Sequence, residues 1–122
     1  MGSGPVLLVV DDEPDFLSMY RRLLGRDGFH VVTAATRAEA LDALAAQRFH
    51  AIVTDVRLPD GTGLDIVRAA RVGDRYTPSI VVSGVGDQQS RESAFAAGAI
   101  AFFAKPFEVA VLAARVRDAV RG

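Results

Sequence analysis

Five short apolar runs alternate along the chain with longer segments in which apolar residues recur at helical spacing. The runs are nearly continuous and rich in β-branched residues, as in strands that are buried on both faces of a sheet. Five strands are therefore predicted, over Val6–Val10, His30–Ala34, Ala51–Thr54, Ser79–Ser83 and Ala101–Ala104.

The segments between and after these runs predict helices. Pro14 suits the first turn of a helix, and the apolar residues that follow it share one face until Gly28. Thr36 and Glu39 have the spacing of a capping box, in which each side chain can satisfy a backbone amide at a helix start. Three further helices are expected, over Leu64–Val72, Asp87–Ala97 with Gly98 at its end, and Glu108–Val120.

Strict alternation of strands and helices predicts an α/β fold of the (βα)5 type, a three-layer sandwich around a parallel five-stranded sheet. The flavodoxin-like strand order 2-1-3-4-5 is a common solution and places a crevice at the carboxyl ends of the first and third strands. We expect residues 1–5 to be a disordered or cloning-derived start, and residues 6–122 to form one domain.

Composition narrows the functional classes. The 122 residues include 14 basic and 15 acidic residues, so the net charge of −1 gives no broad positive field for nucleic acid. The chain has no cysteine, and its apolar runs are far shorter than the roughly 20 residues that span a bilayer. We expect a cytoplasmic protein with no membrane association and no direct binding to nucleic acid.

Acidic residues follow two of the predicted strands. Asp11 and Asp12 follow the first strand, and Asp55 follows the third, which places all three at one edge of the sheet. One such residue alone is more typical of a helix cap or a turn. Two carboxylates about 5 Å apart repel by roughly 3 kcal/mol at an effective dielectric constant of 20, so a cluster needs a proton, a basic side chain or a hard cation. Of these we favour Mg²⁺.

The other two strands end in residues that suit a phosphoryl group. Ser83 ends the fourth strand, and Lys105 follows the fifth, so a hydroxyl and an ammonium reach the same edge. Both can donate hydrogen bonds to phosphoryl oxygens. Together with the carboxylates, they predict a phosphoryl-accepting site.

These motifs resemble the receiver domains of two-component response regulators. The resemblance lies in Asp11-Asp12-Glu13, in Asp55 to Gly63, in Ser83-Gly84 and in Lys105-Pro106-Phe107, and it covers the chain from Val6 onward. It implies that Asp55 is the phosphoacceptor, assisted by Ser83 and Lys105. It also implies that Asp11, Asp12, Asp55 and the backbone carbonyl of Arg57 hold Mg²⁺ or Mn²⁺, and that the Lys105-Pro106 bond is cis.

The resemblance further implies a switch and partners. A histidine kinase or a histidine phosphotransfer protein would supply the phosphoryl group to this signalling domain, which catalyses its own phosphorylation and slow dephosphorylation. Ser83 would then move toward Asp55, and Phe102 would turn inward to reshape the face made by the fourth helix, fifth strand and fifth helix. That face would control a linked output domain or partner and could support a homodimer. Because Phe102 has no hydroxyl to bond outside, we expect it to be inward even without phosphate.

Two other classes of protein share part of this pattern. A haloacid-dehalogenase-type phosphotransferase requires a second aspartate two residues after the nucleophile, where this chain has Arg57. A degenerate receiver that binds partners without phosphorylation would not need all five polar residues of the site. Arg57 is most simply a solvated side chain; the alternative is that it lies over the phosphoryl group and alters hydrolysis, which an unchanged dephosphorylation rate in Arg57→Ala would exclude.

Overall fold

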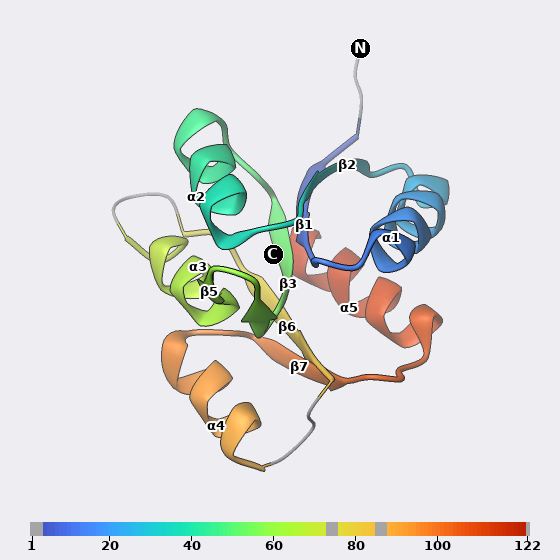
Figure 1. Cartoon of the computed structure of the whole chain (residues 1–122). Coiled ribbons are helices and arrows are strands. Elements are labelled where there is room, and N and C mark those ends of the chain that lie inside the picture. Colours follow the sequence, from blue (N-terminus) through green and yellow to red (C-terminus); the bar gives the residue numbers. More distant parts are fainter. Residues whose placement is uncertain (1–3, 73–75, 85–87, 122) are drawn as a thin grey trace.

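A central parallel sheet organises the computed structural model, which describes residues 4–72, 76–84 and 88–121. Its strands are β1 (Val6–Val10), β2 (His30–Ala34), β3 (Ala51–Asp55), β6 (Ser79–Ser83) and β7 (Ala101–Ala104). They lie side by side in the order β2-β1-β3-β6-β7, all parallel (Figure 1). In terms of the five predicted strands this is the order 2-1-3-4-5, so the predicted sheet is confirmed.

The burial of each strand follows its place in the sheet. Every residue of β3 and β6 is buried, whereas β2 and β7 lie at the two edges and are partly exposed along most of their length. The expectation that all five strands are buried on both faces was therefore wrong for the edge strands, whose outer sides have no neighbouring strand to cover them.

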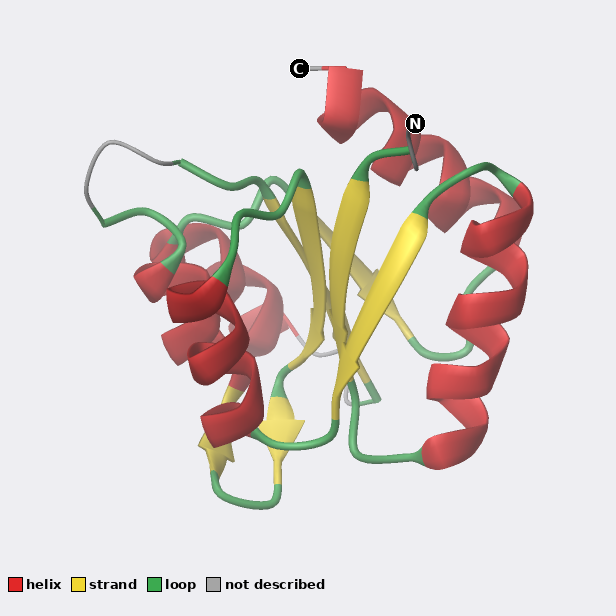
Figure 2. Cartoon of the chain, turned by 90° about the horizontal axis from the view of Figure 1, so that it is seen from above, coloured by secondary structure: helices red, strands yellow, loops and turns green. Residues whose placement is uncertain are grey.

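Helices cover both faces of the sheet (Figure 2). The helices α1 (Pro14–Arg26) and α5 (Val109–Arg121) lie on one face, and α2 (Arg37–Ala46), α3 (Gly63–Ala69) and α4 (Gln88–Ala97) lie on the other. The side chains of β1 alternate between these layers, because Leu7 and Val9 pack with α1 and α5 whereas Leu8 and Val10 pack with α2 and α3. The result is the predicted three-layer sandwich.

The helix boundaries agree with the sequence at most ends. The Thr36 side chain accepts a hydrogen bond from the Glu39 amide as predicted, although the Glu39 carboxylate accepts from Ala35 rather than from within the first turn. The helix α3 ends at Ala69 and not at Val72, because backbone bonds three residues apart tighten the chain beyond it and Val72 is 76% exposed. Gly98 ends α4 with a positive φ of 119°, while the predicted first residue of that helix, Asp87, lies outside the described residues.

A short hairpin after β3 was not predicted. Its strands, β4 (Arg57–Leu58) and β5 (Gly61–Thr62), pair in antiparallel fashion and lie directly before α3 (Figure 1). Strands of two residues are too short for a periodic pattern to appear in the sequence. The hairpin begins only two residues after Asp55.

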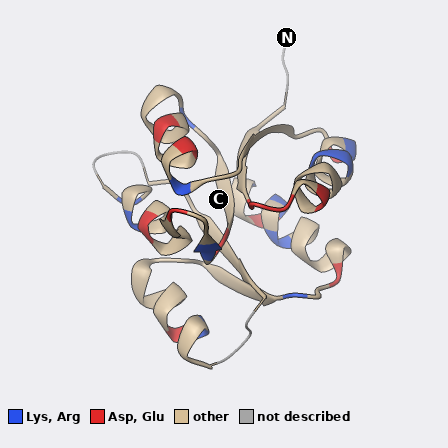
Figure 3. Ribbon diagram, in the orientation of Figure 1, with Lys and Arg blue, Asp and Glu red and all other residues tan. Residues whose placement is uncertain are grey.

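At the start of the described chain, the Pro5 carbonyl accepts a hydrogen bond from the His30 amide at 2.9 Å. The proposed division of the chain at residue 6 stays a prediction. No helix in the described ranges has the length and apolar character required to cross a membrane. Basic and acidic positions are interspersed over the helices on both sides of the sheet (Figure 3).

Candidate functional site

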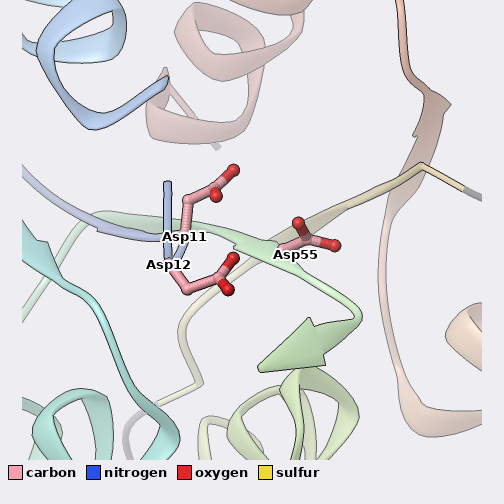
Figure 4. Close-up of side chains that lie close together, drawn as sticks. All are labelled: Asp11, Asp12 and Asp55. Carbon is pink, nitrogen blue, oxygen red and sulfur yellow. The ribbon is translucent and has the colours of Figure 1, made fainter. Parts of the chain in front are cut away.

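Three carboxylates converge where β1 and β3 end (Figure 4). Asp11 directly follows β1 and is 1% exposed, and Asp55 is the last residue of β3 and is 9% exposed. Asp12, the next residue along, is exposed. One oxygen from each of the three lies within 4.8 Å of the others, so the predicted acidic cluster is present.

Local hydrogen bonds fix the orientation of Asp11. Its backbone amide donates to the Ala34 carbonyl at 3.1 Å, which extends the pairing between β1 and β2 past the end of the strand. Its Oδ1 accepts a hydrogen bond from the Glu13 amide at 2.9 Å, in the short-range pattern typical of aspartate in turns. The second oxygen of Asp11 is thereby directed toward Lys105.

Lys105 bridges the two buried carboxylates. Its Nζ lies 2.9 Å from Asp11 Oδ2 and 3.0 Å from Asp55 Oδ2, and only 12% of the side chain is exposed. Burial lowers the pKa of Lys105, but the hydrogen bonds to Asp11 and Asp55 outweigh that effect and hold the pKa above its usual value. A basic side chain therefore compensates part of the carboxylate repulsion directly. Lys105 is the only lysine in the sequence.

The backbone and an aromatic ring place Lys105. Its amide donates to the Ser83 carbonyl at 2.8 Å, and its peptide bond to Pro106 is cis, as predicted. The Lys105 Nζ lies 3.9 Å from the centre of the Phe16 ring, within range of a cation–π interaction. The sequence assigned Phe16 only to the apolar face of a helix, so this contact is an addition from the structure.

The first residue of the hairpin and the first residue of α3 both lie close to Asp55. The Arg57 amide lies 3.4 Å from Asp55 Oδ1, at the long end of hydrogen-bond distances. A β-carbon at Gly63 would overlap the backbone oxygen of Asp55 and approach Thr54 Oγ1 to 2.6 Å. Glycine at this position is what allows α3 to begin against the end of β3.

Ser83 and Phe102 occupy the positions expected for them along the sheet. Ser83 ends β6, is buried, and directly follows Val82, which pairs with Asp55. Phe102 is partly buried against the cluster between α3 and α4, and Phe103 packs on the opposite side of β7 with α1 and α5. The Arg57 side chain is exposed. The proposed roles of these residues in phosphorylation and switching remain predictions.

Tyr20 of α1 is a buried polar residue near Asp11 and Asp55. The sequence did not single it out. Its ring packs against those of Phe16 and Phe107, with a distance of 6.4 Å between centroids in each pair. Its hydroxyl is buried and has no hydrogen-bond partner among the described residues. Burial, together with the negative charges of Asp11 and Asp55, raises the pKa of Tyr20 well above its usual value.

A parallel sheet in this order, with an acidic cluster and a lysine at its carboxyl edge, has the arrangement of a response-regulator receiver domain. The family model of the response regulator receiver domain matches residues 7–117, and the chain belongs to this family of two-component signalling domains. Receiver domains are signalling domains, and the chain is one of them.

The comparisons also identify particular relatives. The chain is 39% identical to transcriptional regulatory protein PrrA of Mycobacterium tuberculosis strain H37Rv over 119 residues, which is 98% of this chain and 51% of that protein. It is 39% identical to transcriptional regulatory protein KdpE of the same strain over 116 residues, 95% of this chain and 51% of the relative. The chain thus spans about half the length of these curated relatives.

Among solved structures, the BeF3-activated receiver domain of DrrB superposes with a TM-score of 0.85 at 32% identity, covering 97% of this chain and 98% of the other. The similarity therefore extends over nearly the whole of a receiver domain that has been studied in its activated form.

Proposed function

We propose that this chain accepts a phosphoryl group on Asp55 and uses it as a signal. The observation that carries the proposal is the convergence of Asp55 with Asp11, Asp12 and Lys105 at the carboxyl edge of the sheet. A carboxylate oxygen of Asp55 forms the new bond to phosphorus, while the bond from phosphorus to the donor's imidazole nitrogen breaks and the imidazole leaves. The product is an acyl phosphate.

Two side chains of this chain stabilise the transferred group. The Lys105 ammonium already lies 3.0 Å from Asp55 Oδ2, so it is near the place where negative charge develops on the phosphoryl oxygens. The Ser83 hydroxyl comes from the neighbouring strand, one residue beyond the partner of Asp55. The two donors can bond different phosphoryl oxygens and hold the group in position.

The donor set fits a divalent cation. One carboxylate oxygen from each of the three aspartates lies within 4.8 Å of the others, close enough for all three to bind one ion. The positive charge of Lys105 offsets only one of their three negative charges, so two negative charges remain. Oxygen ligands of this kind suit Mg²⁺ or Mn²⁺. Asp11, Asp12, Asp55 and the Arg57 carbonyl would hold the ion. When bound, such an ion neutralises charge on the phosphoryl oxygens.

A histidine kinase or a histidine phosphotransfer protein is the proposed donor, and the proposed output is the face formed by α4, β7 and α5. Phe102 belongs to β7 and packs on the side of the sheet that α4 covers. A hydrogen bond from Ser83 to the phosphoryl group would draw the end of β6 toward Asp55 and free space for Phe102. A covalently linked output domain, a separate partner and a homodimer are all compatible with that face.

The test is phosphorylation with a small donor. The protein is incubated with acetyl phosphate or phosphoramidate, with and without Mg²⁺, and its intact mass is measured beside an Asp55→Asn control. We expect a gain of one phosphoryl group that requires both Mg²⁺ and Asp55. If folded protein that binds Mg²⁺ gains no mass, the chain is instead a phosphorylation-independent interaction module.

A further inference from the structure

The tip of the β4–β5 hairpin is hydrogen-bonded to the start of α2. Asp60, in the turn between the two strands, accepts hydrogen bonds from the backbone amides of Arg37 at 2.7 Å and Ala38 at 2.9 Å. These are the first two residues of α2. One carboxylate from the hairpin therefore serves as a cap for a helix that is 22 residues away in sequence.

The cap is needed because the local sequence leaves these two amides unpaired. The first amides of a helix have no partner within the helix. The Thr36 hydroxyl accepts from the Glu39 amide, and the Glu39 carboxylate accepts from Ala35, so the local capping residues bond the amides on either side. Asp60 supplies the acceptors for the remaining pair. Those two backbone amides also hold the pKa of Asp60 below its usual value.

A second set of contacts ties the same segments together. The Arg37 side chain passes Gly61 and bonds Asp65 of α3 through Nε at 2.8 Å. A β-carbon at Gly61 would come within 2.7 Å of the Arg37 Cδ, so glycine leaves room for this crossing. Asp65 also pairs with Arg68 at 2.9 Å. The hairpin is thus held on one side by α2 and joined on the other to α3.

The hairpin carries the backbone that contacts Asp55. Leu58 is buried with residues of α2 and α3, which anchors one strand of the hairpin, while Arg57 precedes it and presents its amide to Asp55 Oδ1. At 3.4 Å this contact is at the long end of hydrogen-bond distances, so a small outward displacement of the hairpin would break it. The proposed metal contact, the Arg57 carbonyl, belongs to the same residue.

We infer that Asp60 is a positioning residue for the phosphoacceptor site: by capping α2 from the hairpin, its carboxylate fixes the Arg57 backbone against Asp55 and the bound divalent cation. The inference rests on the proposed function, since it takes the Arg57 carbonyl as a metal ligand. It links α2, which lies outside the α4–β7–α5 face, to occupancy of the site. Binding of the cation should in turn strengthen the bonds to the Arg37 and Ala38 amides.

The experiment compares two ways of weakening the start of α2. In Asp60→Ala the cap from the hairpin is lost, and in Asp60→Asn the charge is lost with less change of shape. In Thr36→Ala the helix loses its own cap while the hairpin bond is untouched, so this variant is the matched control. Mg²⁺ is titrated into ¹⁵N-labelled unphosphorylated protein, at a temperature at which circular dichroism shows each variant to be folded.

We expect Asp60→Ala to weaken Mg²⁺ binding by roughly three- to tenfold. This is less than the about 10- to 100-fold loss typical when a group bonded directly to a metal ligand is removed, because Asp60 acts on Arg57 only through the hairpin backbone. Asp60→Asn should have a smaller effect in the same direction, and Thr36→Ala should stay within about twofold of the unchanged protein, because its helix cap does not touch the hairpin. Mg²⁺ should shift the Arg37 and Ala38 amide signals in the unchanged protein and much less in Asp60→Ala.

Equal Mg²⁺ affinities in the unchanged protein and Asp60→Ala would overturn the inference while leaving the proposed function intact. Equal weakening by Asp60→Ala and Thr36→Ala would also overturn it, because the effect would then come from helix stability alone. If the unchanged protein itself bound no Mg²⁺, the proposed metal site would fail first and the inference with it.

Discussion

Replacing Gly63 by alanine tests whether the close approach of α3 to the backbone of Asp55 is as tight as the structure shows. The added β-carbon would overlap the Asp55 carbonyl oxygen and lie 2.6 Å from Thr54 Oγ1. The nearest of these atoms is backbone and cannot swing away as the end of a flexible side chain can. Either α3 must move outward or the end of β3 must shift.

Overpacking of this kind costs about 1–3 kcal/mol. Alanine has a better helix propensity than glycine, but that gain is at most about 1 kcal/mol and falls at a helix end, where fewer backbone bonds depend on it. We therefore expect Gly63→Ala to lower the free energy of unfolding by about 2 kcal/mol. With a urea dependence of about 1–2 kcal/mol per molar, the midpoint should fall by roughly 1–2 M.

The matched control is Gly25→Ala. Gly25 lies in the last turn of α1, and a β-carbon there would meet nothing within 4 Å. The same chemical change should then raise the free energy of unfolding, by about 0.5 kcal/mol. Urea unfolding followed by circular dichroism measures both variants. A Gly63→Ala protein as stable as Gly25→Ala would refute the argument that α3 is packed against the Asp55 backbone.

The remaining predictions concern Tyr20 and Lys105. Because the buried Tyr20 hydroxyl has no partner among the described residues, Tyr20→Phe should leave the free energy of unfolding unchanged or raise it by up to about 1 kcal/mol, and a clear loss in urea unfolding would show that the hydroxyl is bonded. The raised pKa of Lys105 means that its contribution to stability is complete below the ordinary value of 10.5 and is lost as the pH rises further. Above that pH, in the absence of divalent cations, the unchanged protein should lose stability more steeply than Lys105→Met; parallel curves would argue against the two ion pairs. Since the chain has a single lysine, NMR can follow the side-chain titration as one signal.

The fold was predictable because its signals are spread over many residues. Five apolar runs, separated by segments with helical spacing of apolar residues, are compatible with few arrangements of strands and helices. The right-handed connections of a parallel sheet reduce the number further. The edges of the sheet were less predictable. His30 belongs to an apolar run yet is exposed, because β2 has a neighbour on one side only, and position in the sheet cannot be read from one strand.

The site was predictable to the extent that its residues follow strands. The end of each parallel strand lies at the same edge, so Asp11, Asp55 and Lys105 could be brought together without a structure. The role of Asp60 could not be predicted, because its partners are backbone amides of a helix 22 residues earlier in the sequence. An aspartate in any turn gives the same local sequence pattern. The cation–π contact of Phe16 was equally hidden, since an apolar face of a helix does not show which polar group it covers.

The distribution of charge at the site explains how a cluster of three carboxylates is tolerated before any ligand arrives. A buried carboxylate without a partner is costly, and Lys105 bonds the two buried ones, Asp11 and Asp55, with a single ammonium. The third, Asp12, is exposed, where water screens its repulsion from the others. A cation that entered from solvent would therefore meet the least compensated carboxylate, Asp12, first. The site keeps its residual negative charge where that charge destabilises the fold least and where a divalent ion can reach it.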